Sequence, residues 1–232
     1  MGELPDQFRC ELVTWEYVYD RTHLIAEQVR AEEWSPDTVV ALARGGWFAG
    51  RVVCDLLGID DLVSLKIEHY VGTGEQADEP QVRYPLPDGA ITDKDILIID
   101  DIADTGQSIQ HAREYIQQND PCSVKTATVS LLDTSKTEPD YVGEQLGDWA
   151  WIVFPWNFIE DMIDLITGVM EKSENTWFTS TEIKDLLQEY HGISHFDLEV
   201  VQPKRVDEVL NEMERRNEIV AGARGLRLPD TS

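Results

Sequence analysis

The sequence predicts an α/β protein built on a parallel sheet, followed by a smaller C-terminal α+β module. Short β-branched apolar runs alternate with amphipathic helical stretches, which is the pattern of a parallel sheet covered on both faces. Glycine turns follow two of the predicted strands, and ligands of such sheets bind outside the carboxyl ends of the strands. We therefore expect a binding site at the two glycine turns.

The elements follow in chain order. Apolar residues spaced three and four apart predict a helix over residues 15–34, which Ser35 and Pro36 end. The rest of the core is predicted as strand 38–43, turn 44–46, helix 47–57, strand 62–68, an irregular segment 70–93 long enough for a flap, strand 95–100, loop 101–106, helix 107–118 and strand 124–132.

The chain changes character near residue 176, where short charged helical pieces begin. Helices are predicted at residues 180–190 and 206–216, and a small hairpin with two glycines at 218–228. Helix, helix and hairpin is the order of a winged-helix module. We therefore predict a main domain over residues 1–172 and a winged-helix-like extension over 173–232.

The charge balance is strongly acidic. The chain has 45 acidic and 19 basic residues, for a formal net charge of −26, and the acids are spread along its whole length. Such a surface disfavours nonspecific binding to nucleic acid and is typical of proteins adapted to high salt, because the Debye length in about 1 M salt is only about 3 Å. We predict a halophilic protein that loses structure in low salt. Ordinary mesophilic acidity is the alternative.

Neither a membrane span nor a secretory signal is expected. The sequence contains no run of eighteen apolar residues, and the N-terminus lacks the basic and apolar regions of a signal peptide. Cys10, Cys54 and Cys122 are far apart and show no metal-binding or redox spacing. The sequence thus indicates a cytoplasmic protein with reduced thiols.

The most informative motif is ILIIDDIADTGQSI, at residues 96–109. An apolar strand ends in Asp100 and Asp101, Asp104 follows, and residues 105–108 open a helix. Backbone N–H groups at such a turn and helix start form a nest for a phosphate. Neighbouring carboxylates suit vicinal hydroxyls and Mg²⁺. The motif predicts a sugar-phosphate site, with an ordinary strand-turn-helix bearing solvated acids as the alternative.

This motif resembles the phosphoribosyl pyrophosphate (PRPP) signature of the type I phosphoribosyltransferases. By that resemblance Asp100 and Asp101 hold the ribose hydroxyls and the Mg²⁺ cofactor. Asp104 matches the carboxylate that faces ring nitrogen seven in 6-oxopurine enzymes, where it is proposed as the general base. The loop around the 5′-phosphate then comprises Ala103, Thr105, Gly106, Gln107 and Ser108.

The resemblance also assigns the earlier glycine turn. Arg44 and Gly45 match the pyrophosphate loop, in which a basic residue followed by glycine turns amides toward the leaving group. Glycine alone more often just relieves a tight bend. Residues 68–84 would form the flap, where Tyr70 and Arg83 could contact pyrophosphate or simply belong to a surface loop.

The segment WIVFPWN, residues 151–157, is similar to the hood of microbial and archaeal hypoxanthine, guanine and xanthine enzymes. By that resemblance Trp151 stacks on the base, Ile152 offers backbone contacts and Asn157 lies near position two of the ring. For Trp156, base binding and core packing are equally expected. The family's lysine for the base O6 atom normally follows the strand directly. Here Lys136 comes a few residues late, and a solvated loop lysine is the alternative.

The resemblance covers residues 39–157 and implies a Mg²⁺-dependent enzyme that joins PRPP to a 6-oxopurine in purine salvage. We expect a homo-oligomer that binds neither membranes nor nucleic acid. The alternatives are a PRPP-sensing transcriptional regulator that reads DNA through the winged-helix tail, or a transferase for another base. We favour a tail that makes oligomer contacts or supports the lid over a DNA reader, because it carries few basic residues.

Overall fold

We describe a computed structural model of the chain, covering residues 7–68, 71–72, 75–76 and 81–229. The chain forms two compact units, each described here by itself. The core unit comprises Glu16–Trp149, and the terminal unit joins Met1–Trp15 to Ala150–Ser232. Among the described residues, no helix combines the length and apolar character needed to cross a membrane.

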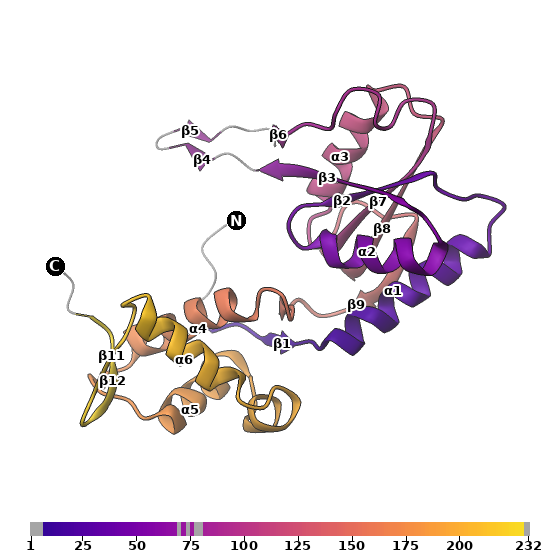
Figure 1. Cartoon of the computed structure of the whole chain (residues 1–232). Coiled ribbons are helices and arrows are strands. Elements are labelled where there is room, and N and C mark those ends of the chain that lie inside the picture. The colour runs from indigo at the N-terminus through magenta and orange to yellow at the C-terminus, as the bar shows by residue number, and fades with distance from the viewer. Residues whose placement is uncertain (1–6, 69–70, 73–74, 77–80, 230–232) are drawn as a thin grey trace. The chain divides into compact units, whose positions relative to one another are not determined.

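The core unit contains a six-stranded sheet in the order β6-β3-β2-β7-β8-β9 (Figure 1). All neighbouring strands run parallel except β6, which pairs antiparallel with β3 at one edge. The predicted α/β fold with a mostly parallel sheet is therefore confirmed. The strands are β2 (Thr38–Leu42), β3 (Asp61–Glu68), β6 (Gln81–Tyr84), β7 (Asp95–Ala103), β8 (Ser123–Leu132) and β9 (Tyr141–Leu146), and β4 (Val71–Gly72) forms a separate pair with β5 (Glu75–Gln76).

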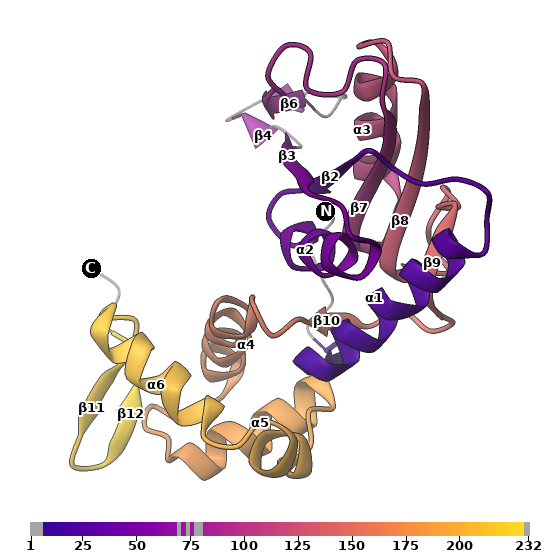
Figure 2. The ribbon, with the colours of Figure 1, turned by 45° about the vertical axis from the view of Figure 1, so that its right-hand side comes forward.

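Helices cover both faces of this sheet (Figure 2). The helices α1 (Trp15–Arg30) and α2 (Gly46–Leu57) pack on the face that carries Leu97 and Ile99. The helix α3 (Gln107–Gln117) packs on the opposite face, which carries Ile96 and Ile98. Successive residues of β7 from Ile96 to Ile99 thus alternate between two apolar cores, which explains why this run is apolar at every position.

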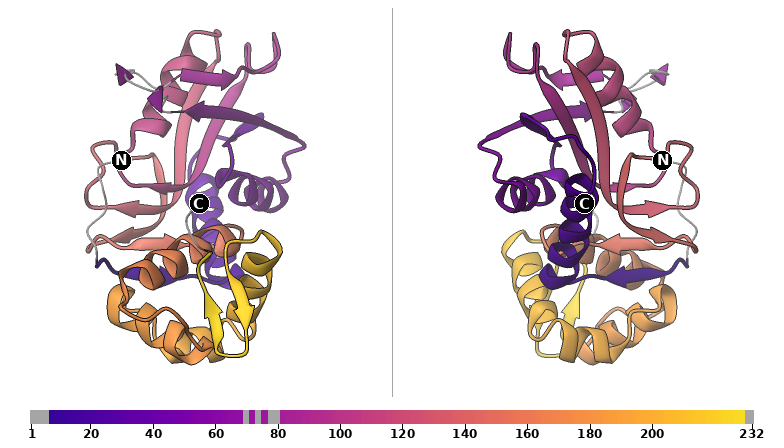
Figure 3. Two further views of the ribbon diagram at one scale, coloured as in Figure 1. Left: turned by 90° about the vertical axis from the view of Figure 1, so that its left-hand side faces the viewer. Right: turned by 90° about the vertical axis from the view of Figure 1, so that its right-hand side faces the viewer.

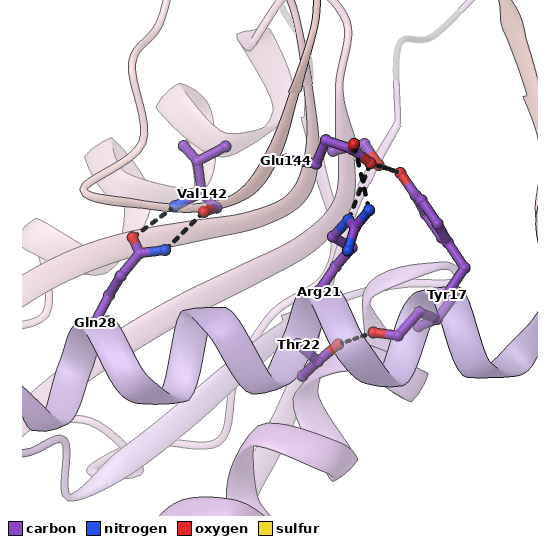
Figure 4. A network of polar contacts seen from close by, with 8 residues as sticks. Tyr17, Arg21, Thr22, Gln28, Val142 and Glu144 are labelled. Atoms are coloured by element: carbon purple, nitrogen blue, oxygen red, sulfur yellow. Dashed lines mark hydrogen bonds and ion pairs between the residues drawn. The ribbon is translucent and has the colours of Figure 1, made fainter.

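Polar side chains of α1 attach this helix to β9, the last strand of the sheet (Figure 4). Arg21 Nε donates to Glu144 Oε2 over 3.0 Å, and the Tyr17 hydroxyl donates to the same oxygen over 2.6 Å. Gln28 donates to the Val142 carbonyl over 2.8 Å and accepts from its N–H over 3.2 Å. Gln28 therefore satisfies backbone groups that would otherwise be exposed at a sheet edge.

Three predicted boundaries need correction. The first helix ends at Arg30 instead of residue 34, because a turn follows it. The strand β7 continues to Ala103, so the first part of the predicted loop 101–106 is strand, held by pairing with β8 as far as Ala103 and Leu131. The flap region contributes the edge strand β6, and Tyr70 lies outside the described residues.

The terminal unit contains a two-stranded parallel sheet of β1 (Cys10–Leu12) and β10 (Trp151–Val153), which run side by side in Figure 3. A capping box between Thr179 and Glu182 begins one of its helices. The remaining elements are α4 (Phe158–Lys172), α5 (Ser180–His191), the π-helix η1 (Asp197–Val201), α6 (Arg205–Arg215), β11 (Val220–Gly222) and β12 (Gly225–Arg227).

One hydrophobic core spans the terminal unit. Phe158 and Met162 of α4 pack in the same cluster as Ile183 of α5 and Met213 of α6. The predicted domain boundary after residue 172 falls inside this cluster, and where the functional domain ends stays a prediction. The predicted reduced thiols fit the structure, in which Cys10, Cys54 and Cys122 form no disulfide.

Candidate active site

The two glycine turns lie next to each other in the core unit, because their strands are neighbours. Ala41 at the end of β2 is in register with Ile99 of β7. The chain then turns through a cis peptide bond between Ala43 and Arg44. The parallel pairing thus places the Arg44–Gly45 turn beside the two aspartates that follow Ile99, as the motif order predicted.

Contact between the two turns leaves no room for a side chain at Gly45. A Cβ atom there would lie 1.7 Å from Asp101 Oδ2 and 2.2 Å from its Cγ. At Gly46, a Cβ would lie 2.6 Å from the Ile99 carbonyl oxygen. Gly46 is therefore required by close approach to the β7 backbone, whereas a side chain at Gly45 would displace the Asp101 carboxylate.

The carboxyl groups of Asp100 and Asp101 are held by backbone N–H groups at the end of β7. The Asp101 N–H donates to Asp100 Oδ1 over 3.0 Å, and the Ile102 N–H donates to Asp101 Oδ1 over 2.9 Å. Removal from water, followed by the charge of Asp101, raises the pKa of Asp100 well above its usual range. A desolvated carboxyl group with a raised pKa at the carboxyl end of a strand is typical of a binding site.

The loop after β7 leads into α3 through Gly106, which has a φ of +74°. The helix α3 begins at Gln107 without a side-chain cap or an acidic residue in its first turn. Its first N–H groups, together with the positive end of the helix dipole, suit an anion such as a phosphate. Of the residues predicted to surround the 5′-phosphate, Ala103 ends β7, Thr105 and Gly106 lie in the loop, and Gln107 and Ser108 begin α3.

A second loop, residues 133–137 after β8, packs against the phosphate loop. Thr134 Oγ1 lies 2.8 Å from Asp104 Oδ1 and 3.1 Å from the Asp104 carbonyl oxygen, and it donates to this residue. The Lys136 N–H donates to the Thr105 carbonyl over 3.2 Å. A Cβ at Gly106 would lie 2.5 Å from Thr137 Cβ. The backbone of Lys136 is therefore beside the loop, and its side chain is exposed.

Thr134 was not identified from the sequence as a site residue. It immediately follows Asp133 at the end of β8, in the region where the resembled enzymes place their lysine. Its position after β8 could have indicated this role, because the loop after β8 lies beside the loop after the neighbouring strand β7.

Trp151, Ile152 and Asn157 lie in the terminal unit. Trp151 is half-buried, and its N–H donates to the Arg9 carbonyl over 2.8 Å. Ile152 is buried in β10, and the Asn157 carbonyl accepts from the Asp161 N–H over 2.9 Å at the start of α4. The ring of Trp156 stacks on Phe154, with centroids 4.8 Å apart. Trp156 thus packs on Phe154, its role in base binding stays a prediction, and Trp151 is partly exposed.

The carboxylates of the core unit suit Mg²⁺ held together with a substrate. Among the described residues, no three His, Cys, Asp or Glu side chains are gathered as a metal site. Mg²⁺ typically binds through one or two carboxylates plus substrate phosphates, so Asp100 and Asp101 beside a phosphate nest fit that mode.

Arg83, predicted as a flap residue, lies with its guanidinium 5.6 Å from the Tyr84 ring centroid.

The mostly parallel sheet, the neighbouring carboxyl groups and the uncapped start of α3 define an α/β protein with a site suited to a sugar phosphate. A family model described as the phosphoribosyl transferase domain matches residues 11–161, and the chain belongs to this family. The predicted resemblance to type I phosphoribosyltransferases is thereby confirmed.

Named relatives agree with this membership. The chain is 25% identical over 156 residues to a xanthine-guanine phosphoribosyltransferase of Gluconobacter oxydans, covering 67% of this chain and 89% of that protein. It is 28% identical over 161 residues to the enzyme of the same name from Idiomarina loihiensis, covering 67% and 92%. A purine phosphoribosyltransferase structure from Pyrococcus horikoshii matches with a TM-score of 0.57 and 27% identity, covering 63% of this chain and 93% of that one.

Proposed function

We propose that this chain transfers the 5-phosphoribosyl group from PRPP to a 6-oxopurine, with release of pyrophosphate, in purine salvage. The observation that carries the proposal is the phosphate loop at the start of α3, beside paired aspartates that touch the Gly45 turn. The relatives named for xanthine and guanine support a purine acceptor. Hypoxanthine, guanine and xanthine are the candidate bases.

The core unit binds and orients the donor in this proposal. The N–H groups of residues 105–108 hold the 5′-phosphate, and Asp100 and Asp101 accept hydrogen bonds from the ribose hydroxyls. Arg44 and the amides of its turn hold the pyrophosphate group. Mg²⁺, bound through Asp100 and Asp101 together with PRPP, supplies charge neutralisation for the departing pyrophosphate.

The bond between the anomeric carbon and the pyrophosphate oxygen breaks as a purine ring nitrogen bonds to that carbon. The base loses a proton in this step, and Asp104 accepts it at a carboxylate oxygen. Thr134 holds that carboxylate by its hydrogen bond to Oδ1. Catalysis then consists mainly of positioning and of stabilising the cationic sugar by nearby carboxylates.

The hood recognises the base in this proposal. Trp151 offers an aromatic face for stacking, Ile152 offers backbone groups, and Asn157 meets position two of the ring. Lys136 is the proposed contact to the O6 atom. These assignments follow the family resemblance and stay proposals for this chain.

The direct test is turnover of the full chain with PRPP and Mg²⁺ in high salt. Hypoxanthine, guanine, xanthine and adenine are offered separately, and nucleotide and pyrophosphate are both measured. We expect at least one 6-oxopurine to be converted faster than adenine, with one pyrophosphate released for each nucleotide formed. Failure to convert any 6-oxopurine under these conditions would refute the proposal.

We propose that the tail has a winged-helix arrangement without being a DNA reader. The support is its order of α4, a bridge from Phe178 to Leu226, α5, α6 and the hairpin. The helix α6 carries Asp207, Glu208, Glu212 and Glu214, which repel phosphates. Retarded migration of DNA by the chain would favour the regulator instead. Cytoplasmic location, the homo-oligomeric state and halophily also remain our predictions.

A further inference from the structure

The hood sheet of the terminal unit is too small to be stable alone. The strands β1 and β10 pair over only three residues each. An isolated two-stranded sheet is at best marginally stable in water, and this one has no turn to join its strands. Trp151 is the proposed stacking residue for the base, and its position therefore depends on the side chains that pack against this sheet.

The hood sheet shares one hydrophobic core with α4 and with the C-terminal extension. Cys10 of β1 and Val153 of β10 are buried in one core with side chains of α4, α5 and α6. Trp151 packs against the same cluster. The family match ends at residue 161, so most of this core is contributed by a part of the chain outside the match. The contributing side chains beyond it include Phe178, Ile183, Leu187, Val206, Val209 and Met213.

One backbone and two side-chain hydrogen bonds hold the two ends of β1 against the extension. Before the strand, the Phe8 N–H donates to the Tyr190 carbonyl over 3.2 Å, and His191 Nδ1 donates to the Phe8 carbonyl over 3.2 Å. After the strand, Gln202 Nε2 donates to the Val13 carbonyl over 3.3 Å. Cys10 of β1 is paired in register with Trp151 of β10. A shift of the extension would therefore move β1 and, with it, Trp151.

Arg205, the first residue of α6, contacts the other end of the hood. Its guanidinium carbon lies 4.4 Å from the centroid of the Phe158 ring. Its Nη2 atom lies 3.5 Å from the Pro155 carbonyl oxygen, at the outer limit of a hydrogen bond. Arg205 therefore bridges the loop that leads from Val153 into α4.

We infer that the C-terminal extension is the scaffold of the base-binding hood, and that Gln202 and Arg205 are positioning residues for the purine. This inference rests on the proposed role of the hood. Gln202 holds the strand beside Trp151, and Arg205 holds the loop that precedes Asn157. The extension thus acts on base binding, whereas the PRPP-binding loops belong to the core unit, which has its own sheet and cores.

The test compares Arg205→Ala and Gln202→Ala with the wild-type full chain. We expect the KM for the base to rise about 10-fold, because a misplaced stacking surface loses about 1.4 kcal/mol of binding. The KM for PRPP should change less than about 2-fold, a split that general loss of structure does not produce. Arg205→Lys should recover part of the base affinity, because it keeps a cation at the Phe158 ring.

Arg215→Ala is the matched control. Arg215 lies on the same helix, its side chain is 78% exposed, and its ion pair is with Glu212 of that helix. The control should leave both KM values unchanged. If Arg205→Ala unfolds, Gln202→Ala decides alone, since it removes a single hydrogen bond.

The outcomes separate the inference from the proposed function. A wild-type chain that converts no 6-oxopurine defeats both. An active wild type with an unchanged base KM in the folded variants defeats the scaffold role alone. An equal rise in both KM values would also overturn it, because the effect would then not be specific to the hood.

Discussion

Replacing Gly45 by alanine should disrupt the donor site more than the fold. The new Cβ would lie 1.7 Å from Asp101 Oδ2, whereas ordinary contact begins at 3.4 Å. The carboxylate must therefore withdraw by about 1.7 Å, which is 3.4 minus 1.7. A 1 Å misplacement of a catalytic or binding group can cost about 100-fold in rate, so we expect kcat/KM for PRPP to fall at least about 100-fold.

The assay is the initial rate as a function of PRPP concentration at saturating base, with thermal unfolding measured on the same samples. Gly168→Ala is the matched control, because Gly168 lies inside α4 and nothing is within 4 Å of its added Cβ. That control should keep wild-type kinetics and gain about 0.5–1 kcal/mol in stability. Wild-type kcat/KM for PRPP in a folded Gly45→Ala variant would refute the close contact between the turns.

The other predictions concern the acids of the site and the charge of the chain. Asp104→Asn should lower kcat about 10²- to 10⁴-fold with little change in PRPP affinity, and equal kinetics would remove Asp104 from the mechanism. Thr134→Val should lower kcat about 5-fold, since a hydrogen bond to an exposed carboxylate is worth about 1 kcal/mol, and should have no further effect in the Asp104→Asn background. Asp100→Asn should raise the melting temperature of the free protein at pH 7 while weakening PRPP binding. The raised pKa means that ionised Asp100 costs stability above its unfolded pKa of about 3.9, so the gain should disappear below about pH 4. Desalting should reduce the helical circular dichroism signal, because the 45 acidic residues outnumber the 19 basic residues and repel one another when salt no longer screens them. An unchanged spectrum would contradict the halophilic prediction.

The elements that surround the phosphate loop could be predicted because local sequence determines them. The apolar run before Asp100 is a strand buried on both faces, and the Thr105–Gly106 turn opens a helix in any such fold. The end of β7 was misplaced because two acids, Asp100 and Asp101, come before its last residues, Ile102 and Ala103. Pairing with β8 keeps them in the strand, and that pairing is not visible in local sequence.

Contacts between distant segments account for what the sequence missed. The strands β1 and β10 are too short to show periodicity and exist only because they pair with each other. The edge strand β9 is held by Gln28 from α1, a contact that no spacing reveals. Thr134 meets Asp104 only because β7 and β8 are neighbours, so its role follows from sheet order.

Calorimetric titration of the chain with PRPP and Mg²⁺ in high salt tests the central claim most directly. We expect saturable binding at one site per chain, and we expect it to be lost when Asp100 and Asp101 are both changed to asparagine in a protein that still folds. No heat of binding in the wild type, or unchanged binding in the double variant, would contradict it.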